Sequence, residues 1–155
     1  MKIVCRAFPS LAALALVSGC VTMPGAQTTS TPEDARPCAR NFVVEGSSLS
    51  LSGTQYKNTV FVPGVSIKNA MDRASKQIAL EGMTITTLDR EGGLIVAANK
   101  VISAKVDTVP LVVTFEQVKD GLKLEMKFRN GFGQLTSEDT VRNGFCNIVS
   151  AIENK

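Results

Sequence analysis

The sequence contains no histidine and no tryptophan, and Tyr56 is its single tyrosine. The absence of histidine excludes Ser-His-Asp catalysis, Cys-His catalysis and histidine-ligated zinc sites. No serine is followed by a lysine three positions later, so the Ser-x-x-Lys signature of histidine-free acyl transfer is also absent. Few aromatic side chains are left as platforms for sugars or nucleic-acid bases. We therefore expect no catalytic residue, no metal site and no cofactor.

Three short patterns are compatible with active-site chemistry but have simpler interpretations. Asp89 with Glu91, and Glu138 with Asp139, are carboxylate pairs of the kind that glycosidases use. The first pair fits a solvated turn better, and the second fits the acidic first turn of a helix. The Gly-Phe-Gly segment 131–133 lies between a strand and a helix, as a phosphate loop would. It lacks a third glycine and a following lysine, which favours a turn.

The apolar stretch from Ala7 to Val17 is too short to span a bilayer, which needs about 20 apolar residues. It follows Lys2 and Arg6, and a short apolar segment behind positive charges is typical of a secretory signal peptide. The stretch ends in Leu-Val-Ser-Gly-Cys at residues 16–20, which resembles the lipobox of bacterial lipoproteins.

The lipobox resemblance implies that residues 1–19 are removed and that the thiol of Cys20 receives the lipid. Anchors of this kind carry two or three acyl chains, and two chains hold a protein stably on a membrane. Val21 stands where an aspartate would signal retention in the inner membrane of a Gram-negative cell. The resemblance therefore implies a lipoprotein of the cell envelope, attached to the outer membrane and facing the periplasm.

The mature chain is expected to be nearly neutral. Removal of residues 1–19 lowers the number of basic residues from 17 to 15, against 14 acidic residues. This balance argues against nucleic acid as a partner. Residues 20–37 are rich in Thr, Pro, Ser and Ala without an apolar period, which predicts a lipidated, disordered tether. Residues 38–155 are then one domain, large enough for a single core.

The apolar periodicity of this domain predicts an α+β fold. One helix is expected between Ser66, as its N-cap, and Gly82; a last helix is expected to be capped by Thr136 or Ser137. Their apolar stripes are Ile67, Met71, Ala74 and Ile78, and Val141, Phe145, Ile148 and Ile152. Strands are expected at 41–44, 49–51, 56–62, 83–88, 94–98, 111–118 and 122–128. These patterns predict an antiparallel sheet of about four to six strands with two helices on one face.

The element order β-α-β-β-β-β-α, behind a lipobox and a linker, resembles the helix-grip domains of some outer-membrane lipoproteins. The resemblance covers residues 54–155 and carries no residue motif. It implies an accessory, non-enzymatic role. Two functions stay open: an interaction module that binds another envelope protein through an exposed sheet face or the glycine loop, and a domain that encloses a small apolar ligand.

Two cysteines remain once Cys5 is removed with the signal peptide and Cys20 is acylated. They are Cys38 and Cys146, and an exported domain folds where disulfides form and persist. We therefore predict a Cys38–Cys146 disulfide. The alternative is that Cys146 is a small buried apolar residue and Cys38 an unpaired thiol in a loop.

Overall fold

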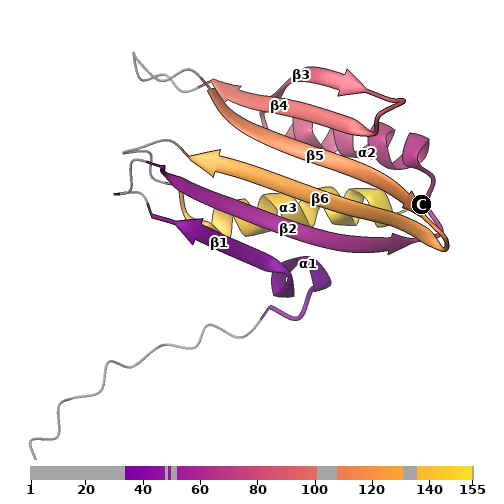
Figure 1. The fold of residues 1–155 in the computed structure, drawn as a ribbon, viewed down its shortest axis with the longest axis horizontal. Helices are drawn as coiled ribbons and strands as arrows, with labels where there is room; N and C mark the ends of the chain where they lie inside the picture. The colour runs from indigo at the N-terminus through magenta and orange to yellow at the C-terminus, as the bar shows by residue number, and fades with distance from the viewer. Residues whose placement is uncertain (1–33, 48, 50–51, 101–107, 131–135, 155) are drawn as a thin grey trace, which may run out of the picture. The chain divides into compact units, whose positions relative to one another are not determined.

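The computed structural model describes residues 34–154, except 48, 50–51, 101–107 and 131–135 (Figure 1). The expected signal peptide, most of the tether and the Gly-Phe-Gly segment therefore lie outside the described residues. The described elements are α1 (Pro37–Arg40), β1 (Phe42–Gly46), β2 (Thr54–Pro63), α2 (Ile67–Leu80), β3 (Thr84–Asp89), β4 (Leu94–Lys100), β5 (Thr108–Val118), β6 (Gly121–Asn130) and α3 (Glu138–Glu153).

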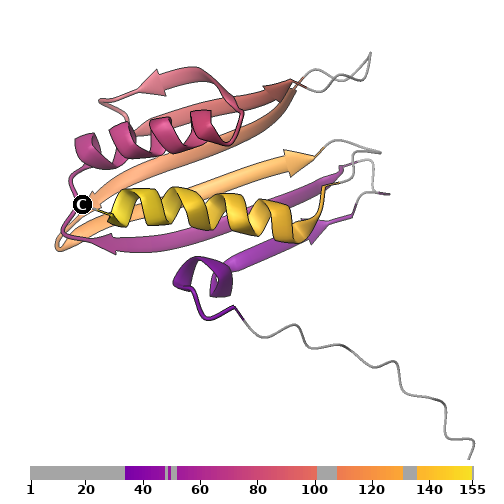
Figure 2. The ribbon, with the colours of Figure 1, turned by 180° about the vertical axis from the view of Figure 1, so that it is seen from behind.

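The six described strands form one sheet in the order β1-β2-β6-β5-β4-β3, and every neighbouring pair is antiparallel. The sheet lies in front of α2 and α3 in Figure 1 and behind them in Figure 2, so both helices cover the same face. From β2 to α3 the element order is β-α-β-β-β-β-α. The predicted α+β fold with two helices on one face of an antiparallel sheet is confirmed.

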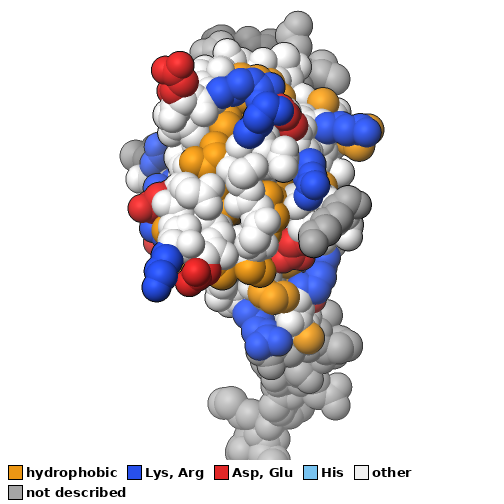
Figure 3. All heavy atoms as spheres, turned by 90° about the vertical axis from the view of Figure 1, so that its right-hand side faces the viewer, with side chains coloured by type: hydrophobic (Ala, Val, Ile, Leu, Met, Phe, Trp, Pro, Cys, Tyr) orange, Lys and Arg blue, Asp and Glu red, His pale blue; other side chains and the backbone are white. Residues whose placement is uncertain are grey.

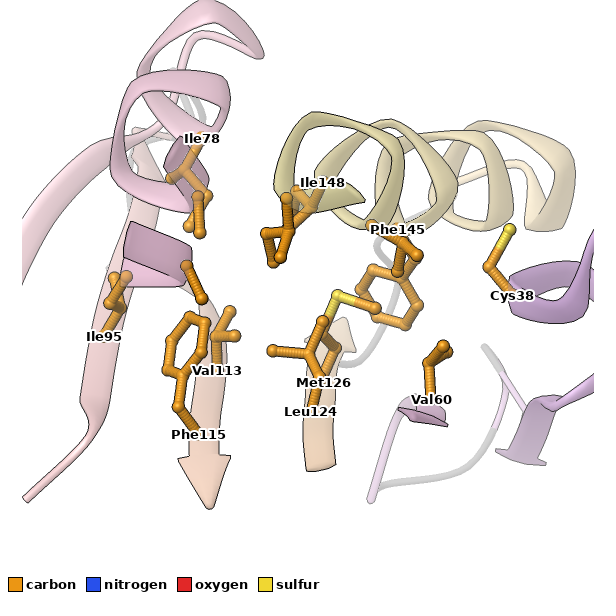
Figure 4. Packing of buried hydrophobic residues seen from close by; sticks show 14 of the residues in the cluster. Cys38, Val60, Ile78, Ile95, Val113, Phe115, Leu124, Met126, Phe145 and Ile148 are labelled. Atoms are coloured by element: carbon orange, nitrogen blue, oxygen red, sulfur yellow. The ribbon is translucent and has the colours of Figure 1, made fainter. Parts of the chain in front are cut away.

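The core fills the layer between the helices and the sheet. Strand β6 alternates as predicted: Leu122, Leu124 and Met126 are fully buried, whereas Lys127 is exposed. Figure 4 shows Leu124, Met126, Val113 and Ile95 pointing from the strands towards the helices. Both predicted helix stripes are confirmed as core, with Ile67 only partly buried; their buried members are Met71, Ala74 and Ile78 on α2, and Val141, Phe145, Ile148 and Ile152 on α3.

Capping residues near the helix ends account for some of the helix boundaries. The Ser66 hydroxyl accepts a hydrogen bond from the Asn69 N–H at 3.4 Å, which confirms the predicted N-cap of α2. Gly82, past the end of α2, has φ of 80°, a conformation that favours glycine. Ser137 is the N-cap residue of α3, but its side chain makes no capping hydrogen bond. The Thr136 hydroxyl donates instead to the side chain of Asn130, at 3.3 Å.

The start of the domain differs from the sequence-based prediction. Helix α1 was not predicted, because four residues make one turn and show no apolar period. The Arg36 guanidinium donates to the Asn143 side chain of α3 at 2.7 Å, so packing begins ahead of the expected boundary at Cys38. Leu49, in an expected strand, is a turn residue with 88% of its surface exposed. The rest of that expected strand, 50–51, lies outside the described residues.

Candidate interaction surface

The sheet face opposite α2 and α3 is the candidate functional surface, because no described element lies over it (Figures 1 and 2). An antiparallel sheet often has one face on the core and the other in water. Since side chains alternate between the faces, the neighbours of the buried core residues in each strand make up this open face. Its composition changes from one side of the sheet to the other.

The open face of β1, β2 and β6 is charged. Its ionic side chains are Glu45, Lys57, Lys123, Glu125, Lys127 and Arg129. Lys57 pairs with Glu45 at 2.6 Å, and Lys123 pairs with Glu125 at 2.8 Å. The hydrogen bond between the latter two raises the pKa of Lys123 and lowers the pKa of Glu125. Exposed pairs of this kind contribute little to stability, and they keep this side of the face solvated.

The open face of β3, β4 and β5 carries a patch without charges. We call this the uncharged patch; it consists of Thr84, Thr87, Leu94, Val96, Ala98, Pro110, Val112 and Thr114. Asp89 lies directly opposite Leu94 at the edge of the patch, and Glu116 follows Thr114 on the same face of β5. Two neighbouring halves of one sheet face therefore differ sharply in charge.

The strand register assembles the uncharged patch. Val96 lies directly opposite Val112, and Leu94 lies opposite Thr114. Opposite residues on one face of an antiparallel pair are close enough for their side chains to contact. Leu94, Val96 and Val112 are half-buried, although no described element covers them. A partner that covered them would remove further apolar surface from water, which is the main driving force of association.

The end of the sheet where the C-terminus lies has a different surface. Figure 3 views this end, and its hydrophobic side chains are separated by charged and polar ones. Phe61, with 51% of its surface exposed, lies near this end of β2. Scattered exposed apolar side chains are normal on a protein surface and indicate no site by themselves.

The predicted disulfide is present. Cys38 of α1 and Cys146 of α3 are joined by an S–S bond of 2.02 Å with their Cα atoms 5.4 Å apart, and both residues are buried. The Asn58 side-chain amide of β2 donates to the backbone carbonyl of Cys38. The alternative of two unpaired thiols is therefore wrong. Cys20, the predicted lipidation site, lies outside the described residues.

The carboxylate pairs have structural roles. The Asp89 carboxylate accepts hydrogen bonds from the backbone N–H of Glu91 at 3.1 Å and of Gly92 at 2.9 Å, which closes the turn after β3. Glu138 and Asp139, in the first turn of α3, both pair with Arg142. Among the described residues, no group of three or more Cys, Asp or Glu side chains is placed to hold a metal ion. Within the same ranges, no helix is long and apolar enough to cross a membrane.

The layer between the helices and the sheet is occupied by side chains. The described buried residues form one cluster, which extends from Cys38 at one side to Ile78 and Ile95 at the other (Figure 4). Met71 and Met126 are fully buried within it.

Sequence reasoning identified the disulfide but missed the uncharged patch. The patch residues come from three strands, and none of those strands is distinctive by itself. The absence of charged residues from Thr84 to Leu88 of β3 was the sequence feature that could have indicated the patch. The chain matches no protein-family model and no curated protein.

Proposed function

We propose that this chain is a non-enzymatic lipoprotein of the cell envelope, tethered to a membrane through Cys20, whose domain binds another envelope protein. The observation that carries the proposal is the uncharged patch on an open sheet face. A protein partner would cover its half-buried apolar side chains, and the ionic groups of β2 and β6 would form a polar rim beside it.

Two observations support this location, one for the tether and one for the compartment. The first is the Leu-Val-Ser-Gly-Cys segment at residues 16–20, which resembles a lipobox. The second is the buried Cys38–Cys146 disulfide, because such bonds persist in oxidising compartments such as the periplasm and are rare in the cytosol. The near-neutral charge of the mature chain also fits a protein partner better than nucleic acid.

A matched pair of lysine substitutions tests the binding surface. Thr114 of β5 and Thr59 of β2 are both exposed, and both lie directly opposite Glu125 of β6. Thr114→Lys places a charge in the uncharged patch, whereas Thr59→Lys places the same charge on the ionic side. We expect Thr114→Lys to weaken partner binding at least about tenfold, because an ammonium loses hydration in an apolar contact. Thr59→Lys should leave binding close to wild type.

The measurement is quantitative mass spectrometry of proteins that cross-link to and co-purify with the full-length lipidated chain from envelope extract. A partner that is lost with Thr114→Lys and retained with Thr59→Lys would support the proposal. Equal capture by both variants would place the binding surface elsewhere. A small apolar molecule that stays bound to both variants in native mass spectrometry would instead favour a ligand-binding lipoprotein.

A further inference from the structure

Strand β3 is an edge of the sheet with unusually little protection. Among the described strands it pairs with β4 alone, and each of its six residues except Ile85 is exposed. Edge strands expose unpaired backbone N–H and C=O groups, and proteins usually blunt them with charges, proline or a covering element. Residues 84–88 contain neither charge nor proline. The opposite edge, β1, carries Glu45 in an ion pair and adjoins α1 with its disulfide.

A bulge in β3 changes which of its side chains share a face. The register shifts between Ile85 and Thr87, and the hydroxyl of Thr86 donates to the Val96 carbonyl at 3.2 Å. As a result, Ile85 lies opposite Ala97 and Leu88 lies opposite Ile95, and both of these partners are buried beneath the helices. Two apolar residues three positions apart thus point to the helix-covered side. Leu88 nevertheless keeps 41% of its surface exposed.

We propose that a second copy of this chain pairs with β3 edge to edge, in antiparallel orientation about a two-fold axis. The pairing that centres on Thr86 and Thr87 places Ile85 opposite Leu88 of the partner subunit on the helix-covered face. It also places Thr84 opposite Asp89 of the partner subunit on the open face. Directly opposite residues of an antiparallel pair share a face, so this register matches apolar with apolar and polar with polar. Without the bulge, Ile85 and Leu88 would point to opposite faces and the match would be lost.

The position of Asp34, where residues 1–33 join the domain, is compatible with edge-to-edge pairing of β3. Residues 1–33 join at Asp34, which is held beside α3 by the Arg36–Asn143 hydrogen bond and the nearby disulfide. This attachment is on the β1 side, so β3 is the far edge, about 25 Å away at the usual strand spacing. A two-fold axis perpendicular to the sheet keeps both attachment points at the outer edges. In this respect the pairing rests on the proposed lipid tether, which lets both copies sit on one membrane.

Membrane confinement also explains how a short edge can pair. Stable interfaces bury about 1,200–2,000 Å², and a strand of six residues supplies a small part of that area. Two copies anchored on one membrane meet at a much higher effective concentration than free copies do. We therefore expect association on the membrane and little association in dilute solution.

A double cysteine variant tests the register. In Thr84→Cys/Asp89→Cys, the new thiols are five positions apart in one copy, too far to be bridged, but adjacent across the proposed pair. The full chain with both substitutions is expressed, and membranes from the expressing cells are treated with a short bifunctional maleimide. We expect a cross-linked dimer at least several-fold more abundant than with Thr84→Cys or Asp89→Cys alone. Adding Leu88→Lys should remove the dimer, and adding Val43→Lys, on an exposed residue of the opposite edge strand β1, should not.

Three results would overturn the pairing: no dimer from the double variant, equal dimer from the single variants, or a dimer that survives Leu88→Lys. Mass spectrometry of the mature N-terminus on the same samples reads the lipid tether separately. A dimer with an unmodified Cys20 would uphold the pairing and reject the tether. A lipidated protein that gives no cross-linked dimer would uphold the tether and reject the pairing.

Discussion

Phe145 joins α3 to the strands at the disulfide side of the core. Its ring meets that of Phe42 edge-on, with centroids 5.9 Å apart, and Phe42 stacks on Tyr56 at 5.8 Å. Only 3% of the Phe145 surface is exposed. Phe145→Ala removes these contacts and leaves a cavity, so we expect a loss of about 3–5 kcal/mol in the free energy of unfolding. Urea denaturation measures this loss. A loss of unfolding free energy no larger than that caused by substituting an exposed residue would contradict the packing of α3.

Replacing Gly144 and Gly121 with alanine should change the free energy of unfolding in opposite directions. A Cβ at Gly144, inside α3, would meet no atom within 4 Å. Because glycine weakens a helix interior, Gly144→Ala should stabilise the domain by about 0.5–1 kcal/mol. A Cβ at Gly121 would lie 2.4 Å from the Val62 carbonyl oxygen, so Gly121→Ala should destabilise by about 1–3 kcal/mol. Thermal unfolding of both variants is the check, and shifts of the same sign would contradict these environments.

Tyr56 should make stability fall at alkaline pH. Its hydroxyl donates to the Thr136 carbonyl at 3.2 Å, and burial, together with the charge of Glu138, raises the pKa of the phenol above 10.0. Because the folded pKa lies above the unfolded one, the stabilisation is complete below pH 10 and is lost as the pH rises through the folded pKa. Tyr56→Phe should therefore show a weaker decline above about pH 10 than wild type. Parallel slopes in urea titrations of the two proteins would contradict this assignment.

At the scale of elements, α1 depends on the disulfide. A helix of four residues is not stable alone, and α1 is held against α3 by the Cys38–Cys146 bond and the Arg36–Asn143 hydrogen bond. The bond closes a loop with a sequence separation of 108 residues. Long loops gain most from closure in the chain-entropy model.

Replacement of both cysteines by serine should lower the free energy of unfolding by up to about 4–5 kcal/mol. Reductant should shift the urea midpoint of the wild type towards that of Cys38→Ser/Cys146→Ser and leave the double variant unchanged. Peptide mapping without reduction provides the direct control. Two thiols that alkylate freely after denaturation, without reductant, would show that the bond does not form in the cell.

The elements also show where sequence reasoning succeeds. Ser66 and Gly82 bracket α2 as predicted, because capping depends on nearby residues. The alternation of β6 identified its buried face, because a strand with one face on the core repeats every two residues. Helix α1 and the turn at Leu49 gave no such periodic signal.

At the scale of the whole molecule, the proposed lipid anchor would decide where the open face can act. We expect the mature protein to begin at Cys20 with acyl chains on it, and mass spectrometry of the N-terminal peptide measures this. The Cys20→Ala protein should no longer be found in the membrane fraction, but its domain should still be folded and disulfide-bonded. Cys5→Ala, within the expected signal peptide, is the matched control and should change nothing. An unmodified N-terminus, or a Cys20→Ala protein that stays wholly membrane-bound, would reject the anchor.

The sequence by itself determined the α+β class, the core faces of α2, α3 and β6, and the disulfide pairing. Each of these depends on local periodicity, on caps or, for Cys38 and Cys146, on elimination. Such features need no knowledge of which distant segments meet.

Only the tertiary structure decided the strand order β1-β2-β6-β5-β4-β3 and its registers. These place Val96 against Val112, separate the charged side of the open face from the uncharged patch, and leave β3 as a bulged edge of the described sheet. The physical reason is that strand pairing joins residues far apart in the chain. The pairing is selected by burial of one face of the whole sheet against α2 and α3, which no single segment encodes.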